Sequence, residues 1–226
     1  MAPHNIWLDC AQWVSVGKTV ACRFQYGHHM EAQGKASPGR ARLWVAAPGG
    51  EPVELALVED GETLSAEFSP TVRGVYALLG EYDPGVWSVT TDGRHLPGAA
   101  GEQAGEEVVR TISYGHFAKR LVFVEKDTPW PGSFGREMEI VPLQPAGREQ
   151  EILIQYRGRP LGGVKVYVHG RGRAGARYGV TGPDGKVEFG LPAGEWLLLA
   201  RHESPGTAAD GANVRVTSAV LALTRS

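Results

Sequence analysis

Two adjacent histidines that follow a short apolar stretch are the residues of this sequence best suited to chemistry. In residues 24–31, Phe-Gln-Tyr-Gly-His-His-Met-Glu, two imidazoles, a thioether and a carboxylate fall within four positions. The tripeptide Tyr-Gly-His returns at residues 114–116, and a further histidine, His4, stands near the amino terminus. Imidazoles bind several transition metals. We therefore expect these three places to come together as a transition-metal site.

A plainer interpretation of the same residues stays open. Histidine clusters are only suggestive of ligation, and on this view His28 and His29 are surface loop residues while His116 is an ordinary strand histidine. The remaining histidines stand at turns, strand ends or loops, and we expect them to be solvent-exposed: His95, His169 and His202.

The overall composition indicates a folded globular protein. The chain has 226 residues, of which 42% are hydrophobic and 21% charged, which is long enough for one large domain or two of ordinary size. The net charge is −2 and no run of Lys or Arg exceeds two residues. Because binding to phosphate backbones needs a concentrated basic surface, we expect no nucleic acid partner.

Glycine and proline separate short apolar runs along the whole chain, which predicts an all-β protein. Residues 5–14 and 19–26 alternate apolar and polar side chains with a period of two. The positions that we expect on the inner face of these two strands are Ile6, Leu8, Cys10, Trp13, Val20, Cys22, Phe24 and Tyr26. Further short strands are expected at 41–46, 53–58, 62–68, 74–79, 86–90, 107–112, 113–124 and 138–143.

The pattern of short strands starts again after residue 145. About seven strands are expected in the last 80 or so residues, which is the size and spacing of an immunoglobulin-like sandwich. Asp184-Gly185 is a turn signal that requires a positive φ. We therefore predict two consecutive immunoglobulin-like or transthyretin-like β-sandwich domains, one at residues 1–145 that binds the metal and one at 146–226.

The only two cysteines, Cys10 and Cys22, are expected to lie nearly opposite each other in a hairpin. A disulfide and a pair of free thiols both remain open. No apolar run approaches the roughly 20 residues that a membrane span needs. Residues 1–4 carry neither a basic nor an apolar signal region, and we expect that Met1 stands where a leader peptide has been removed.

Over nearly its whole length, the chain resembles the NikM/NikK-like family. Members of this family are the periplasmic substrate-binding accessory components of energy-coupling-factor nickel and cobalt importers. The second half also resembles carboxypeptidase-regulatory and transthyretin-like modules. The stretches that carry these resemblances are 4–8 (His-Asn-Ile-Trp-Leu), 17–20, 26–28 (Tyr-Gly-His), 74–76, 138–143 (Met-Glu-Ile-Val-Pro-Leu), 159–166, 181–189 and 191–196.

The family resemblance implies a secreted β protein that captures a divalent metal and delivers it to a membrane permease. Carried over by position, it places the metal ligands at His4, His28 and His116, with His29 as a close alternative. It implies Ni²⁺ or Co²⁺ as the cargo and a periplasmic location. Zn²⁺ and Cu²⁺ would suit the same imidazoles in vitro. Because Pro3 has no N–H to lose, a square-planar chelate through the amino terminus is not expected.

Neighbouring groups are assigned no metal role. Met30 fits a partly buried side chain better than a Cu(I) ligand. Glu31 and Asp9 could orient an imidazole, but solvated carboxylates are the commoner case. Binding is expected to weaken below about pH 6, where protons compete for imidazoles.

An enzyme is not expected, because no nucleophile elbow, phosphate loop or paired zinc-protease histidines occur. Residues 156–158, Tyr-Arg-Gly, resemble the terminal motif of a ureide hydrolase with a transthyretin-like fold, but here they lie in mid-chain. The two Tyr-Gly-His stretches resemble the two tyrosines and two histidines of intradiol dioxygenases. The remaining alternative is an immunoglobulin-like interaction or adhesion module that binds no metal.

Overall fold

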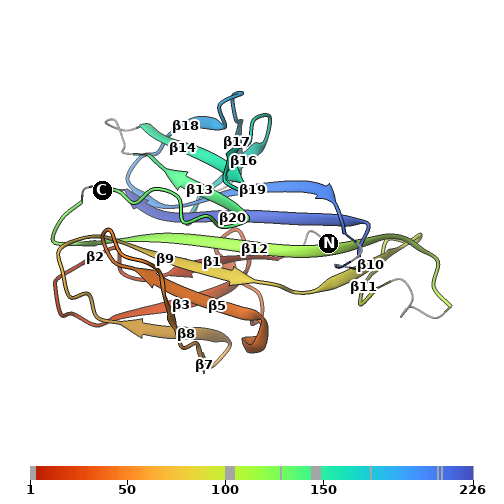
Figure 1. Cartoon of the computed structure of the whole chain (residues 1–226), viewed down its shortest axis with the longest axis horizontal. Helices are drawn as coiled ribbons and strands as arrows, with labels where there is room; N and C mark the ends of the chain where they lie inside the picture. The colour runs from red at the N-terminus through yellow and green to blue at the C-terminus, as the bar shows by residue number, and fades with distance from the viewer. Residues whose placement is uncertain are drawn as a thin grey trace.

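The computed structural model is almost entirely β (Figure 1), and it describes residues 4–99, 105–127, 129–143, 149–173, 175–207, 209 and 211–225. Its strands form three sheets, and the described residues include one short 3₁₀ turn, Pro38–Arg40. The all-β prediction is therefore confirmed. Among these residues no helix is long and apolar enough to cross a membrane.

The first sheet has five strands and carries the amino-terminal part of the chain. Its order is β1 (Asn5–Asp9), β3 (Val20–His28), β8 (Thr63–Phe68) and β7 (Val58–Asp60), with β4 (Glu31–Ala32) paired to the end of β3.

The second sheet has eleven strands and contains residues from both halves of the chain. Its main path is β17 (Arg177–Val180), β16 (Lys165–Gly170), β19 (Gly194–Pro205), β20 (Val214–Arg225), β12 (Val108–Val124), β9 (Gly74–Tyr82), β5 (Ala41–Ala46) and β6 (Val53–Leu55). Beside this path, β2 (Trp13–Val14) and β10 (Val86–Thr90) pair with β12, and β11 (His95–Pro97) pairs with β10.

The third sheet has four strands. The central strand is β14 (Glu149–Tyr156). The other three each pair with it: β13 (Met138–Pro142), β15 (Arg159–Pro160) and β18 (Lys186–Gly190).

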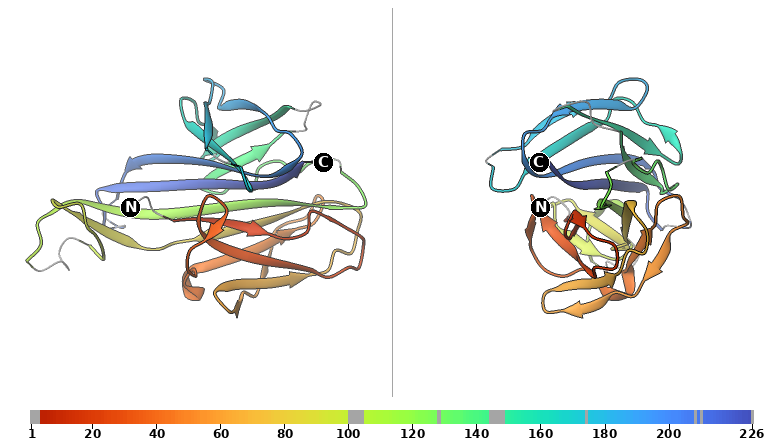
Figure 2. Two further views of the ribbon diagram at one scale, coloured as in Figure 1. Left: turned by 180° about the vertical axis from the view of Figure 1, so that it is seen from behind. Right: turned by 90° about the vertical axis from the view of Figure 1, so that its left-hand side faces the viewer.

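The long second sheet is the shared layer between two sandwiches. In Figure 1, β12, β19 and β20 run through the middle of the molecule, with β1, β3 and β8 on one side and β13, β14 and β18 on the other. The end-on view in Figure 2 shows the same stacking of amino-terminal and carboxy-terminal strands. The two halves are joined by parallel pairing of β12 with β20, from Ile112↔Val214 to Arg120↔Ala222.

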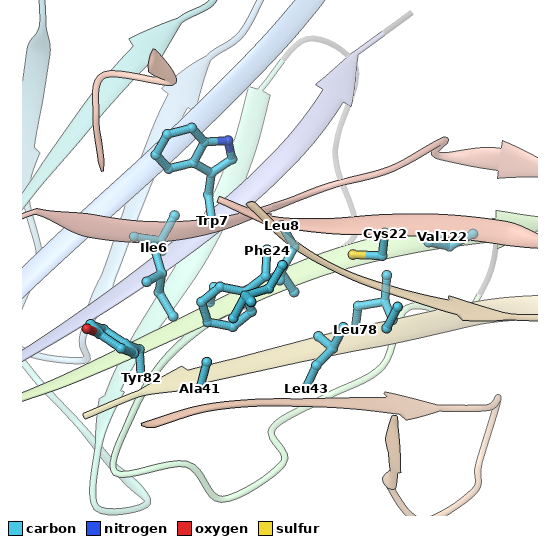
Figure 3. Close-up of a cluster of buried hydrophobic side chains, with 14 of the residues drawn as sticks. Ile6, Trp7, Leu8, Cys22, Phe24, Ala41, Leu43, Leu78, Tyr82 and Val122 are labelled. Carbon is cyan, nitrogen blue, oxygen red and sulfur yellow. The ribbon is translucent and has the colours of Figure 1, made fainter. Parts of the chain in front are cut away.

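Both faces of this shared layer are buried, which explains its continuous apolar sequence. On β20, Val220 packs into the core beneath the first sheet, whereas Ala219 and Leu221 pack into the core beneath the third sheet. Figure 3 shows the first of these cores, in which Leu8 and Phe24 meet side chains from β5, β9 and β12.

Most strand positions agree with the predictions. The stretch 53–58, expected as one strand, is divided between β6 and β7, which lie in different sheets. The stretch 5–14 also differs. The strand ends at Asp9, and residues 13–14 form a separate short strand parallel to the end of β12. Trp13 is therefore 55% exposed and its ring lies 4.6 Å from that of Phe123, so its predicted place on the inner face is wrong. The residues around 107–124 form a single strand of 17 residues.

The predicted domain boundary at residues 145 and 146 lies outside the described residues. The strand that precedes it, β13, pairs with β14 and contributes Met138 and Ile140 to the second core. A buried ion pair also links this strand to the shared sheet, because the ammonium of Lys119 on β12 contacts the carboxylate of Glu139, each side chain being 3% exposed.

Cys10 and Cys22 are free thiols that face each other across two strands. The antiparallel register of β1 and β3 ends at Asp9↔Arg23, so the next opposed positions are the two cysteines. A hydrogen bond from Cys22, helped by Arg120, lowers the pKa of the Cys10 thiol, whereas the same contact and burial raise the pKa of Cys22.

Candidate functional site

A tight turn at the end of β3 positions the adjacent histidines. His28 pairs with Glu31 across the turn, and the two residues between them, His29 and Met30, have φ values of 52° and 67°. Two positive φ angles in a two-residue loop are the hairpin geometry that matches the twist of the flanking strands. A side chain at Gly27 would place its Cβ 2.2 Å from the carbonyl oxygen of Glu31, so only glycine permits this turn.

The register of β1 against β3 brings His4 to His28. Because Asn5 pairs with Gly27, the residue before β1 lies opposite the last residue of β3. The ring centroids of His4 and His28 are 4.5 Å apart, and the ring of His29 is 6.1 Å from that of His28. Three of the four predicted ligands therefore lie in a row.

The row continues into the second half of the chain through a histidine that was expected to be exposed. His169, at the end of β16, is half-buried and stacks on His29 with ring centroids 4.6 Å apart. The expectation of exposure is also wrong for His202, which is half-buried and lies 4.6 Å from the ring of Tyr156. It is confirmed for His95.

The fourth predicted ligand, His116, lies deeper in the fold. It is 2% exposed, and its Nδ1 is 2.6 Å from the hydroxyl oxygen of Ser218. Burial, followed by the positive charge of Arg201, lowers its pKa to about 3. A series of ring contacts through Tyr26 and Tyr82 connects it to the half-buried His4: His4–Tyr26 at 4.6 Å, Tyr26–Tyr82 at 5.4 Å and Tyr82–His116 at 6.3 Å.

The histidines with shifted pKa values in this region are held in the neutral form. Burial, then His4, lowers the pKa of His28, and burial, then His29, lowers the pKa of His169. A neutral imidazole is the form that binds metal. At neutral pH, ligation by these side chains would therefore not require the removal of a proton from the ring nitrogen that binds.

A groove of about 760 Å³ runs beside the histidine row, between the edge of β1 and the face of β16 and β19. His28, His29 and His169 line it, with Trp7 and Leu199 as apolar walls. Sites for small ligands in proteins commonly have volumes of about 300–1,000 Å³. The groove is thus large enough for a small molecule.

The groove wall supplied by the second half follows from a period-two pattern on β16. Val166 and Val168 face the second core, so Lys165, Tyr167 and His169 face the other way, into the groove. The alternation was visible in the sequence. That this face meets β1 and the turn after β3 depends on the β12–β20 pairing, for which no local signal exists.

The neighbouring groups Met30, Glu31 and Asp9 differ in exposure. Met30 is buried at 7% exposure, Glu31 is exposed, and Asp9 lies 3.5 Å from Arg171. Within the described part of the chain, no three His, Cys, Asp or Glu side chains already converge as a group that would hold a metal ion. The preformed part of a metal site is therefore the pair His4 and His28. His29 is the next donor in the row, and His169 stacks on it.

The family model described as "Domain of unknown function (DUF4198)" matches residues 1–204. The chain belongs to this family. No curated protein matches it.

Among solved structures, a two-domain fibronectin type III segment of chicken tenascin is similar at 10% identity over 98% of this chain and 99% of that chain, with a TM-score of 0.28. A cytokine receptor complex is similar at 13% identity over 96% and 95%, with a TM-score of 0.27. Likenesses this distant carry no information about function.

Proposed function

We propose that this protein is an extracytoplasmic binding protein for Ni²⁺ or Co²⁺ that captures the ion through its histidine row and delivers it to a membrane importer. The observation that carries the proposal is the contact between His4 and His28, whose ring centroids are 4.5 Å apart beside a groove. Two imidazoles at this separation can turn their nitrogens toward one ion. The resemblance to the NikM/NikK-like family supports nickel or cobalt as cargo and a permease as partner.

In this proposal His4 and His28 bind first, and His29 or His116 completes the protein's share of the ligands. His29 is adjacent to His28, at 6.1 Å between ring centroids, on the exposed tip of the turn. His116 is buried, and the rings of Tyr82 and Tyr26 connect it to His4. Zn²⁺ and Cu²⁺ also favour imidazole, so they would compete in vitro.

Calorimetric titration of chelator-stripped protein with Ni²⁺, Co²⁺, Zn²⁺ and Cu²⁺ tests this proposal. The variants to compare with the wild type are His4→Ala, His28→Ala and His116→Ala. His95→Ala is the matched control, because His95 is exposed on β11, outside the histidine row. We expect His4→Ala and His28→Ala each to weaken nickel binding by at least about tenfold, because even loss of a group that only orients a ligand costs about 10–100-fold, and His95→Ala to bind as the wild type does.

The rival function, an interaction module without a metal, predicts a different result. Such a protein would bind none of the four ions with defined stoichiometry, and its stability would be indifferent to chelators. Binding that is equally strong in all four variants would also contradict the proposed site.

A further inference from the structure

A half-buried cation, Arg201, lies at the histidine row. Arg201 on β19 lines the groove, and its Nη2 donates a hydrogen bond to the side-chain oxygen of Asn5 at 3.2 Å. Its Nε is buried and has no acceptor within the described residues. Glu203 also lines the groove and acts on Arg201 electrostatically, but its carboxylate is engaged in an ion pair with Arg110 at 2.5 Å. Arginine remains charged at any pH at which proteins are folded.

Other groups of the groove add positive charge and hydrogen-bond donors. Lys165 is a second cation on its wall. Trp7, which is 2% exposed, also lines the groove, and its indole N–H is buried with no acceptor among the described residues. Buried donors without acceptors are costly. Together they match an anion.

The charge of Arg201 also bears on the histidines. Arg201 and His28 line the same groove, so the guanidinium disfavours further positive charge at this ring. The same field disfavours a bare divalent cation bound to the ring nitrogens of His28. A negatively charged group that enters the groove with the metal would remove this repulsion and supply an acceptor for the Nε of Arg201.

Coordination chemistry leads to the same kind of ligand. The preformed pair His4 and His28 provides two nitrogen donors, whereas nickel and cobalt commonly take four to six ligands. An organic acid with several carboxylates provides the remaining oxygens and the negative charge at once. The groove volume of about 760 Å³ accommodates a molecule of that size.

We propose that the groove takes the metal as its complex with a small organic polycarboxylate, with the metal on His4 and His28 and a carboxylate on Arg201. This inference rests on the proposed function and specifies its substrate class. Lys165, on the neighbouring strand β16, contributes a weaker, longer-range attraction to the same anion.

Equilibrium dialysis with nickel and radiolabelled citrate tests the inference on the intact chain. Bound nickel is counted by atomic absorption and bound citrate by its label, so the stoichiometry of each component is measured separately. The variants are Arg201→Gln, which removes the charge, and Arg201→Lys, which keeps it. Arg42→Gln is the matched control, because Arg42 forms an exposed ion pair with Glu54 on a distant edge of the sheet. Circular dichroism verifies the fold of each variant.

We expect nickel and citrate to be retained together in a ratio of about one to one, and nickel to be held about tenfold more tightly with citrate than without it. Arg201→Gln should abolish this gain, whereas Arg201→Lys should restore part of it and Arg42→Gln should leave it unchanged. If nickel binds but citrate only withdraws it from the protein, the inference is overturned and the proposed function stands. If nickel is retained in no sample, the proposed function fails and the inference fails with it.

Discussion

The buried neutral histidine His116 makes the stability of the metal-free protein depend on pH in a calculable way. In the unfolded chain a histidine has a pKa of about 6.5, whereas in the folded protein burial lowers the pKa of His116 to about 3. Between these values the unfolded chain binds a proton that the folded protein does not. The stability associated with the neutral ring is therefore fully present above about pH 6.5 and is lost as the pH falls toward 3.

The size of the loss follows from the same two values. At pH 4.5 the unfolded histidine is almost fully protonated and the folded one almost fully neutral, so linkage gives a loss of about 2–3 kcal/mol relative to pH 7. The side chain is 2% exposed, and solvent therefore screens this effect little. His116→Gln keeps a polar partner for Ser218 and removes the titrating ring.

Urea denaturation of the wild type and of His116→Gln at pH 7 and at pH 4.5, with a metal chelator present, measures this loss. We expect the stability of the wild type to fall by about 2–3 kcal/mol more than that of the variant. His95→Gln, which changes an exposed histidine, should follow the wild type at both pH values. If the stabilities of the wild type and His116→Gln change in parallel, the reasoning about His116 is refuted.

Three further predictions concern the framework of the site. Glu139→Gln leaves the ammonium of Lys119 buried without its counter-charge and should lower the free energy of unfolding by about 3–5 kcal/mol, as measured by urea denaturation. Iodoacetamide should label Cys10 before Cys22, because Cys10 is half-buried with a lowered thiol pKa and Cys22 is buried with a raised one, and Cys22→Ala should slow the labelling, as followed by mass spectrometry. Gly27→Ala should destabilise the protein by about 2 kcal/mol and weaken nickel binding, because the added Cβ meets a carbonyl oxygen at 2.2 Å.

Each of these predictions has its own control. The double variant Lys119→Met with Glu139→Gln removes both charges, keeps an acceptor for Ser133 and Phe134, and should recover most of the lost stability; a loss as large as that of Glu139→Gln alone would mean that the pair does not behave as a buried ion pair. Equal labelling rates of the two cysteines would contradict the proposed difference in the pKa and exposure of their thiols. Gly39→Ala, where a Cβ would meet nothing within 4 Å, should leave stability and nickel binding unchanged.

Local patterns in the sequence were sufficient to predict most of the strands. The period-two alternation of residues 19–26 located β3, and the Asp184-Gly185 signal located a turn in which Gly185 has a φ of 77°. These features depend on neighbours in the chain. Trp13 was misplaced because its partner, Phe123, is more than a hundred residues away, and nothing near Trp13 indicates that it leaves the first sheet.

The same limit applies to the site. The Tyr-Gly-His stretch and His4 were visible as candidate ligands, and the register of β1 against β3 brings His4 to His28. Arg201 and His169 were not recognised, because they reach the groove only through the parallel pairing of β12 with β20. A pairing between residues about one hundred positions apart has no periodicity that a single sequence can reveal.

The central claim is that one divalent ion binds between His4 and His28, and anomalous diffraction from crystals of the nickel-loaded protein tests it most directly. We expect one anomalous peak at the nickel absorption edge, with a ring nitrogen of each histidine at about 2.1 Å from it, the usual metal–imidazole distance. A peak at some other place on the surface, or no peak in crystals grown with excess nickel, would contradict it.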